Sequence, residues 1–342
     1  TRWDRKDWAG AAQAYARLAK DHPDSPLANA ARVSAGRALV EAGRANDARP
    51  MLEQAAAAGG PESLDAAHRL AVLEIDAGNR GRAVEIVARA LSKTSKDADP
   101  AAVARLELDR VEALWELPGK RAEAGAAAAA LVERHPRSRS AARGLEYAAL
   151  ALVEANKAAD AVARIDAFLA TNAADAPPDA VLGLRGTKAE ALLAQGKAAA
   201  AAAAWRSLIE AEPKSPRRTG WLLREGVALA AAKEWSRTHE ALSKAVAELR
   251  GDDRAEALLL DATALVELDK PAEAAALLAS LEKESPKWPR RAEAMLLRVR
   301  ALREAGDAAA ARDAAERLVK EFPEGPGADV AWFRLGQIRQ EQ

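Results

Sequence analysis

The chain has 342 residues, and its 51 basic and 51 acidic side chains give a net charge of zero. This balance argues against a general nucleic-acid binder, which needs a basic excess to displace the counterions of the phosphates. The chain contains no cysteine, which excludes disulfides and thiolate metal sites within it. No apolar run approaches the roughly 20 residues of a membrane-spanning helix, so we expect no direct insertion into a membrane.

Alanine dominates the apolar residues of the chain. Hydrophobic residues make up 49% of the sequence but aromatic residues only 4%. Alanine suits helices that pack closely on other helices and suits a β-sheet poorly. The composition therefore predicts an all-α protein.

The first predicted element is an amphipathic helix within residues 1–22, which ends before Pro23. Proline lacks the N–H that would continue a helix, and it restricts the residue before it. The same kind of helix end, followed by proline, recurs at 132–138, 209–216, 282–289 and 320–326. These endings indicate a repeated unit.

A small residue and a larger apolar one recur before such endings at helical spacing and form a stripe, as in Ala201, Trp205 and Leu208. The small position recurs every 35 to 41 residues, at Ala11, Ala48, Ala83, Ala124, Ala161, Ala201, Thr238, Ala274 and Ala311. Upstream of the stripe lies a break, which separates it from another amphipathic helix. The breaks are at Gly43, Gly78, Gly119, Asn156, Gly196, Lys233, Asp269 and Gly306.

Each repeat thus has a first helix, a break and a second helix that carries the stripe. Counted by phase, residues 1–22 are the second helix of a cut repeat, residues 25–323 contain eight whole repeats, and residues 326–340 are the first helix of another cut repeat. We expect about 18 helices in a single solenoid over residues 1–342, and a fragment of a longer array, because solenoids need polar capping elements at their ends. The alternative, in which the terminal helices are themselves polar enough to act as caps, stays open.

The repeat resembles the tetratricopeptide repeat, whose signature is W-x2-L-G-x2-Y, then A-x3-F-x2-A, then P. Trp332, Leu335 and Gly336 occupy the first three signature places, and Gly36 and Gly226 occupy the glycine place of other first helices. The period here exceeds the family's 34 residues, and several first helices lack the Trp and the Gly. The resemblance implies an α-solenoid, a right-handed superhelix of antiparallel helix pairs, with the role of a scaffold or adaptor.

A second, narrower resemblance concerns the cellular compartment. The phrase HPDSP at 22–26 is similar to repeats of bacterial cell-envelope proteins, such as outer-membrane assembly lipoproteins and the periplasmic coordinator of the Tol–Pal system. A composition rich in alanine and arginine fits a GC-rich bacterium. Both features favour the bacterial periplasm or cell envelope over the cytoplasm.

Sequence motifs for chemistry are missing. None of the four histidines stands in HExxH or HxH, and there is no GxxxxGK[ST], GxGxxG or GxSxG. The carboxylates interleave with Arg and Lys on helix faces, as in residues 303–317, where such pairs support the surface of a helix. We expect no enzymatic activity, no cofactor and no metal site.

The resemblance places a partner segment on the concave face of the solenoid, which is lined by first helices. Some family members clamp a C-terminal carboxylate there with Lys and Asn. Here the Lys place holds Val33, His68, Asp109, Glu146, Gly186, Leu223, Leu259 and Leu296, and the Asn place holds Arg37, Val72, Ala113, Leu150, Glu190, Val227, Thr263 and Arg300. No such clamp is present, and we expect instead a largely apolar contact surface in the C-terminal half, made by Leu223, Val227, Leu259, Leu296 and Arg300.

Trp288 is a further candidate for contact with a partner. It lies between two prolines in SPKWP, in a turn that joins successive repeats. It is either an exposed anchor for a partner or a cap over the hydrophobic seam, and the sequence leaves both interpretations open.

The turns that link successive repeats alternate in charge from the middle of the chain onward. The basic turns hold Arg134, Arg137 and Arg139, then Lys214, Arg217 and Arg218, then Lys287, Arg290 and Arg291; the acidic turns hold Asp175 and Asp179, then Asp252 and Asp253, then Glu321 and Glu324. One interpretation is a ladder of ion pairs between turns, and the other is an edge that recognises a partner of alternating charge. An Arg at the start of a helix opposes the helix dipole, so the stability of the single helix does not explain the basic turns.

The leading hypothesis is a non-enzymatic scaffold that holds a peptide or helix of a partner protein on its concave face. The alternative is a structural spacer or a self-assembling, coat-like element, which stacks end to end through its terminal helices.

Overall fold

The computed structural model describes residues 7–324 and 328–340, and the described residues form 18 α-helices with no strand. The helices are α1 (Trp8–Asp21), α2 (Ala28–Glu41), α3 (Ala45–Ala57), α4 (Pro61–Asp76), α5 (Arg80–Ser92), α6 (Pro100–Trp115), α7 (Arg121–Arg134), α8 (Ala141–Glu154), α9 (Ala158–Asn172), α10 (Pro178–Ala194), α11 (Ala198–Ala211), α12 (Arg218–Ala231), α13 (Trp235–Ala245), α14 (Gly251–Glu267), α15 (Pro271–Glu284), α16 (Arg291–Glu304), α17 (Ala308–Glu321) and α18 (Ala328–Gln340). The predictions of an all-α fold and of about 18 helices are confirmed.

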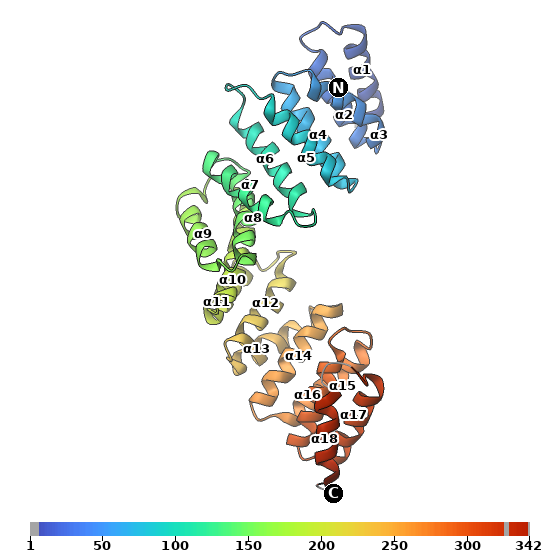
Figure 1. Ribbon diagram of the computed structural model, residues 1–342, viewed down its shortest axis with the longest axis vertical. Helices are drawn as coiled ribbons and strands as arrows, with labels where there is room; N and C mark the ends of the chain where they lie inside the picture. Colours follow the sequence, from blue (N-terminus) through green and yellow to red (C-terminus); the bar gives the residue numbers. More distant parts are fainter. Residues whose placement is uncertain (1–6, 325–327, 341–342) are drawn as a thin grey trace. The chain divides into compact units, whose positions relative to one another are not determined.

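The chain forms two compact units, Thr1–Ala191 and Leu192–Gln342, with the boundary inside α10. From α1 to α9 in the N-terminal unit, and from α11 to α18 in the C-terminal unit, consecutive helices pack on one another, as the rows of helices in Figure 1 show. The first helices of neighbouring repeats also meet, since α4 contacts α2 and α6 in the N-terminal unit, and α14 contacts α12 and α16 in the C-terminal unit. Each unit is therefore a layered stack of helix pairs with the character of an α-solenoid.

The predicted breaks between paired helices are confirmed by the backbone. All eight have positive φ, from 57° to 81°: Gly43, Gly78, Gly119, Asn156, Gly196, Lys233, Asp269 and Gly306. At Lys233 the following N–H, that of Glu234, donates to the carbonyl of Leu229 at 3.0 Å, and the N–H of Lys233 donates to the carbonyl of Ala230 at 2.9 Å. This is the Schellman arrangement, which satisfies the last carbonyls of a helix and needs a left-handed residue.

The predicted stripes of the second helices form the core of each repeat. In α3 the stripe residues Ala48, Leu52 and Ala55 have no exposed area, and in α13 Thr238 and Leu242 have none either. A Cβ built on Gly36 would lie 2.6 Å from Cδ2 of Leu52, and one on Gly226 would lie 2.2 Å from Cδ2 of Leu242. The glycine place of the first helix is therefore the hole into which the second helix inserts its larger residue.

In the C-terminal unit, an ion pair with a spacing of 30 residues joins the two helices of three successive repeats. The pairs are Arg218 with Glu248, Arg254 with Glu284 at 3.0 Å, and Arg291 with Glu321 at 2.6 Å. In each case an Arg in the first turn of a first helix meets a Glu near the end of the second helix, because the two helices are antiparallel. The basic turns are thus explained by the neighbouring helix, whose negative dipole end and Glu both attract the Arg.

The charge ladder predicted from the turns is confirmed only in part. Arg291 and Glu321 pair as that interpretation requires. Arg290 instead binds Glu256 and Glu293, so its partner comes from within a helix and not from the acidic turn at Asp252. The pair of Arg290 with Glu256 thus connects two successive repeats. Glu256 lies one helical turn beyond the acidic linking turn at Asp252.

Candidate functional site

Charged side chains of successive first helices meet across the N-terminal unit. On α4, Asp65 accepts a hydrogen bond from Nε of Arg69 at 2.8 Å, and Nη2 of Arg105 on α6 lies 3.3 Å from the same carboxylate. The side chains of Asp65 and Arg69 are 31% exposed, and that of Arg105 is 42% exposed. These groups are therefore both ordered by their neighbours and accessible from outside.

One helical turn further on, His68 of α4 binds Asp109 of α6, with Nδ1 and Oδ2 2.7 Å apart. The Asp109 side chain is only 7% exposed, against 24% for His68. Burial raises the pKa of Asp109, although the hydrogen bond and charge of His68 and the charge of Arg105 oppose this shift. The pair links the first helix of one repeat to the first helix of the next.

Arg143 of α8 is the centre of a third group of polar side chains. Its guanidinium donates to Glu146 at 2.6 Å and to the hydroxyl of Tyr147 at 2.9 Å, and it reaches Glu112 of α6 at 3.5 Å. Burial raises the pKa of Glu112, and burial together with the charge of Glu112 raises the pKa of Tyr147 to about 12. A Cβ on Gly183 of α10 would lie 2.9 Å from Glu146, so the next first helix leaves room for this carboxylate.

Two aromatic rings lie beside Arg143. The centroids of Trp115 and Tyr147 are 5.3 Å apart with the rings tilted by 58°. The guanidinium of Arg143 lies 4.7 Å from the centre of the Tyr147 ring, and that of Arg121 lies 5.1 Å from the centre of the Trp115 ring. Both distances suit cation–π contact.

We call this set of side chains on α4, α6 and α8 the charged track. It consists of Asp65, His68, Arg69, Arg105, Asp109, Glu112, Arg143, Glu146 and Tyr147. Each of its three groups spans two neighbouring first helices, so the track follows the direction in which repeats are stacked. Its guanidinium and carboxylate groups can form charge-assisted hydrogen bonds to an external ligand.

The residues predicted as an apolar contact surface in the C-terminal unit are less open than expected. Leu223 and Val227 on α12 and Leu296 on α16 are half-buried. Leu259 on α14 is only 2% exposed and belongs to the core, so its assignment to an exposed surface was wrong. Arg300 remains exposed and binds Glu304 at 2.8 Å and Glu267 at 3.2 Å.

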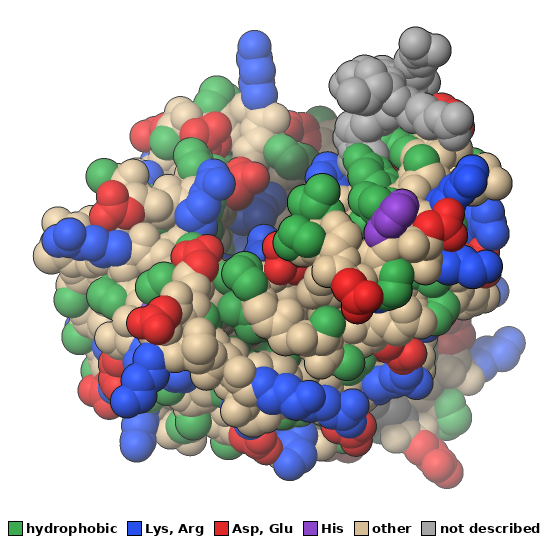
Figure 2. Space-filling view, turned by 90° about the horizontal axis from the view of Figure 1, so that it is seen from above, with side chains coloured by type: hydrophobic (Ala, Val, Ile, Leu, Met, Phe, Trp, Pro, Cys, Tyr) green, Lys and Arg blue, Asp and Glu red, His purple; other side chains and the backbone are tan. Residues whose placement is uncertain are grey.

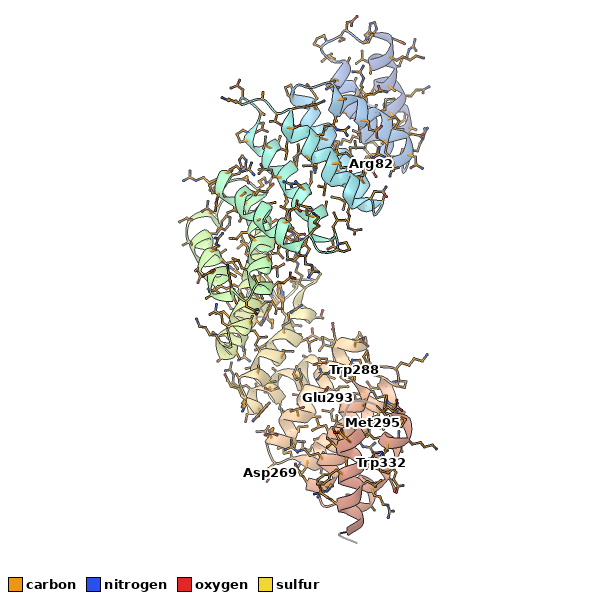
Figure 3. The ribbon with its side chains drawn as sticks, in the orientation of Figure 1. Arg82, Asp269, Trp288, Glu293, Met295 and Trp332 are labelled. Atoms are coloured by element: carbon orange, nitrogen blue, oxygen red, sulfur yellow. The ribbon has the colours of Figure 1, made fainter. Side chains whose placement is uncertain are left out.

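Trp288, labelled in Figure 3, belongs to the C-terminal unit. It is 7% exposed and packs in the main core cluster of that unit. The turn brings it inward because the N–H of Trp288 donates to the carbonyl of Ser285 at 3.2 Å and the N–H of Arg291 donates to that of Trp288 at 3.1 Å. The interpretation as a cap over the hydrophobic seam agrees with the structure, and the interpretation as an exposed anchor was wrong.

A hollow of about 590 Å³ lies between the second helices α3 and α5. Its charged lining includes Glu53, Arg82, Glu85, Arg89 and Lys93, and Figure 3 labels Arg82. Arg82 lies 2.5 Å from Glu53, so the charge of this basic side chain is already neutralised within the hollow. The basic and acidic side chains visible in Figure 2 are interspersed in the same way, which fits a chain of zero net charge.

Nowhere in residues 7–324 and 328–340 do three or more His, Asp or Glu side chains come together in a way that could hold a metal ion. His68 and His239 each meet one buried carboxylate, that of Asp109 and Asp261 respectively. Among the helices of the described chain, none combines the length and the apolar character that crossing a bilayer requires.

Three segments of the chain, residues 2–25, 39–107 and 259–326, match family models described as tetratricopeptide repeat. These segments are tetratricopeptide repeats. The segment 39–107 contains Asp65, His68, Arg69 and Arg105 of the charged track, and the segment 259–326 contains Trp288. No curated protein matches the chain in sequence.

Three solved structures are similar to the chain. A tetratricopeptide repeat protein from Parabacteroides merdae ATCC 43184 is 15% identical, with a TM-score of 0.53 over 79% of this chain and 98% of that chain. A putative kinesin light chain of Podospora anserina with nearly identical TPR-like repeats is 19% identical, with a TM-score of 0.47 over 55% of this chain and 96% of that one. A Rap protein in complex with Competence and Sporulation Factor is 10% identical, with a TM-score of 0.49 over 98% of both chains.

The charged track escaped the sequence interpretation, although part of its signal was visible. The Lys place holds His68, Asp109 and Glu146 in three successive repeats, and three ionisable residues in a row at a helix face are an unusual choice for packing alone. His68 and Asp109 bind each other, and Arg143 binds Glu146. Asp65, Arg105 and Arg143 complete the network from other positions of the repeat, so no single place reveals it.

Proposed function

We propose that the chain is a non-enzymatic scaffold that holds a segment of a partner protein on the face formed by its first helices. Tetratricopeptide repeats stack into preformed surfaces, which bind an extended segment or a helix at little ordering cost to themselves. The match to this repeat and the layered helix pairs support a binding role, and the residues of the charged track suggest where binding occurs.

The observation that carries the proposal is the energetic cost of the charged track. Stability alone favours apolar side chains at half-buried helix contacts, because a buried ion pair often stabilises less than a hydrophobic pair of similar volume. Here burial raises the pKa of both Asp109 and Glu112, which means that their charged forms lose solvation in the folded chain. Perturbed ionisable groups of this kind concentrate at functional sites.

The chemistry of the track suggests the chemistry of the bound segment. Arg105 and Arg143 have side chains that are 42% and 41% exposed, and each can bind a carboxylate through two N–H groups. The half-exposed Glu112, at 36%, can accept from a Lys or Arg of the same segment. The aromatic pair Trp115 and Tyr147 supplies apolar area beside these charges. A partner segment of mixed charge with an apolar residue fits this face.

In the C-terminal unit we propose a smaller contribution from the half-buried Leu223, Val227 and Leu296, with Arg300 at the edge. Leu259 and Trp288 lie behind this surface and support it from the core. Their part is to hold α14 and α16 in place and not to touch the partner.

The test uses peptides selected from a phage-displayed library of random sequences on the intact chain. Binding of the selected peptides is measured by fluorescence anisotropy for the chain and for two charge reversals. Arg105→Glu lies on the track, whereas Arg82→Glu lies on the second helix α5 and is similarly exposed, at 54%. Each reversal removes an ion pair, with Asp65 and Glu53 respectively. Arg82→Glu also removes the contact of Arg82 with the buried Glu74 at 3.9 Å, so the control is the more severe change to the fold.

We expect Arg105→Glu to weaken binding by about tenfold or more, which corresponds to about 1.4 kcal/mol, and Arg82→Glu to leave it unchanged. A library that yields no binder, or binders that respond to Arg82→Glu and not to Arg105→Glu, contradicts the proposal. Circular dichroism of both variants confirms that the helices persist.

A further inference from the structure

A second hollow, of about 450 Å³, lies at the edge of the N-terminal unit, where the turns between successive repeats run. It is lined by the turn between α3 and α4, the turn between α5 and α6, and the N-terminal halves of α4 and α6, which are labelled in Figure 1. We call it the edge hollow. Its apolar wall consists mainly of the buried Leu64 and the half-buried alanines Ala56, Ala90, Ala98 and Ala102.

The edge hollow corresponds to a place that is filled in the C-terminal unit. Counted from the small position of each second helix, Ala90 of α5 corresponds to Leu281 of α15, which has no exposed area. Counted from the Lys place of each first helix, Leu64 of α4 corresponds to Ala255 of α14. Leu281 and Ala255 belong to one core cluster with Trp288. The walls of the edge hollow thus correspond to the surroundings of Trp288.

The turn between α5 and α6 supplies no aromatic side chain to this space. In the C-terminal unit the N–H of Trp288 donates to the carbonyl of Ser285 at 3.2 Å, and in the turn after α5 the N–H of Ala98 donates to that of Ser95 at 3.2 Å. Ala98 therefore takes the place of Trp288. Leu64 is larger than its counterpart in α14, but it compensates only in part, since the hollow remains. The space has the position and the surroundings of an aromatic side chain.

The charges around the edge hollow favour a basic group beside such a ring. The ionisable residues of its lining are Asp65, Lys93, Asp97, Asp99 and Arg105. Asp99 accepts a hydrogen bond from the N–H of Ala101 at 3.0 Å, and Asp65 is bound by two Arg side chains. The exposed carboxylate of Asp97 has no ion pair within residues 7–324 and 328–340. Lys93 lies on the wall that the edge hollow shares with the hollow between α3 and α5.

The edge hollow adjoins the charged track. Asp65 and Arg105 belong to the track and also line the hollow, so their ion pair lies where the two meet. In the C-terminal unit the guanidinium of Arg290 lies 5.8 Å from the centre of the Trp288 ring. Arg105 can make the same cation–π contact with a ring in the edge hollow. A segment that lies on the track can therefore place a side chain in the hollow.

From these observations we propose that the edge hollow binds an aromatic side chain of the partner segment and that Asp97 binds a basic residue next to it. The inference rests on the proposed function, because it locates one residue of the segment that the charged track holds. The bound ring makes the packing contacts that Trp288 makes in the C-terminal unit. A buried aromatic side chain covers about 150–250 Å², so this residue is the main anchor of the segment.

The first test uses the peptides selected on the intact chain from a phage-displayed library of random sequences. We expect these peptides to share an aromatic residue with a neighbouring Lys or Arg. Replacement of the aromatic residue by Ala should weaken binding by about tenfold or more in fluorescence anisotropy. Peptides that share no aromatic residue, or whose affinity is unchanged by this replacement, overturn the proposal.

The second test fills the edge hollow from within the chain. Ala98→Trp places an indole where Trp288 lies in the C-terminal unit, and it should weaken peptide binding by about tenfold or more. The control is Lys96→Trp, because Lys96 belongs to the same turn, is exposed and does not line the hollow. This control should leave binding unchanged. Equal affinity of the two tryptophan variants overturns the proposal, and circular dichroism confirms that the helices persist in both.

A third variant does not alter the packing of the chain. Asp97→Lys lies at an exposed position, so it leaves the fold intact even if Ala98→Trp impairs it. The reversal should weaken binding by about threefold or more, because it removes the partner of the basic residue. Unchanged binding to the Asp97→Lys chain overturns the assignment of a basic residue beside the ring.

A variant of the charged track away from the edge hollow separates this inference from the proposed function. Arg143→Glu lies on α8 and does not line the hollow. Peptides that lose affinity for the Arg143→Glu chain but bind the Ala98→Trp chain unchanged occupy the track without the hollow, which overturns the inference alone. Peptides that respond to Ala98→Trp and not to Arg143→Glu support the hollow and contradict binding along the track. A library that yields no binder overturns both.

Discussion

The close approach of Leu242 to Gly226 gives the sharpest test of how the repeats are built. The perturbation is Gly226→Ala, which places a Cβ 2.2 Å from Cδ2 and 2.7 Å from Cγ of Leu242. Leu242 has no exposed area, so it cannot move out of the way. Overpacking of this kind costs about 1–3 kcal/mol, against a gain in helix propensity of about 1 kcal/mol for Gly to Ala.

The matched control is Gly220→Ala in the same helix, α12, where nothing lies within 4 Å of the added Cβ. This change gains propensity without a clash, so it should stabilise the chain by up to about 1 kcal/mol. The difference between the two variants in free energy of unfolding then isolates the packing cost, and we expect about 1–3 kcal/mol in favour of Gly220→Ala. Urea unfolding followed by circular dichroism measures it.

Equal stability of the two alanine variants would refute the reasoning, because it would mean that Leu242 does not fill the space at Gly226. A double-mutant cycle gives an independent check. Leu242→Ala alone should cost about 2–5 kcal/mol. Combined with Gly226→Ala it should cost less than the sum of the two single changes, because the shorter side chain removes the clash.

Three further predictions concern single features of the fold. Lys233→Gly should raise the free energy of unfolding by about 1 kcal/mol in urea melts, since Lys233 has a φ of 57°, and destabilisation would contradict this. For Asp109, whose pKa is raised by burial, stability should fall as pH rises above the unfolded value near 3.8. In urea titrations at several pH values, the free energy of unfolding of Asp109→Asn should therefore rise relative to that of the original chain as the pH increases. Stabilities that change in parallel with pH would refute this expectation. Arg291→Glu should lower the melting temperature, and adding Glu321→Arg should restore it, because the swapped pair also suits both helix dipoles; no recovery would contradict the ion-pair account.

The fold was predictable because the sequence repeats its local signals. Gly43 and Gly306 mark left-handed turns by residue type, and the shared period then assigns the same role to Lys233, which no local rule would select. The stripe of Ala48, Leu52 and Ala55 likewise follows from helical spacing alone. Period and spacing thus predict the helix pairs and the core of each repeat.

The candidate site was not predictable in the same way, because it depends on contacts between neighbouring repeats. The period does not fix the rotation of one repeat on the next, and this rotation decides whether His68 reaches Asp109. The path of a linking turn is also invisible in the sequence, and it decides that Trp288 points into the core. Contacts between neighbouring repeats also place Leu259 deeper than its half-buried counterparts Leu223 and Leu296.

The central claim is that a partner segment binds along the first helices of the N-terminal unit. Hydrogen–deuterium exchange of the chain with a saturating amount of a selected peptide tests it most directly. The account predicts slower amide exchange in α4, α6 and α8, which carry Asp65, Asp109 and Arg143, with α3, α5 and α7 unchanged. Slower exchange confined to α3, α5 and α7, with the first helices unaffected, would contradict the claim.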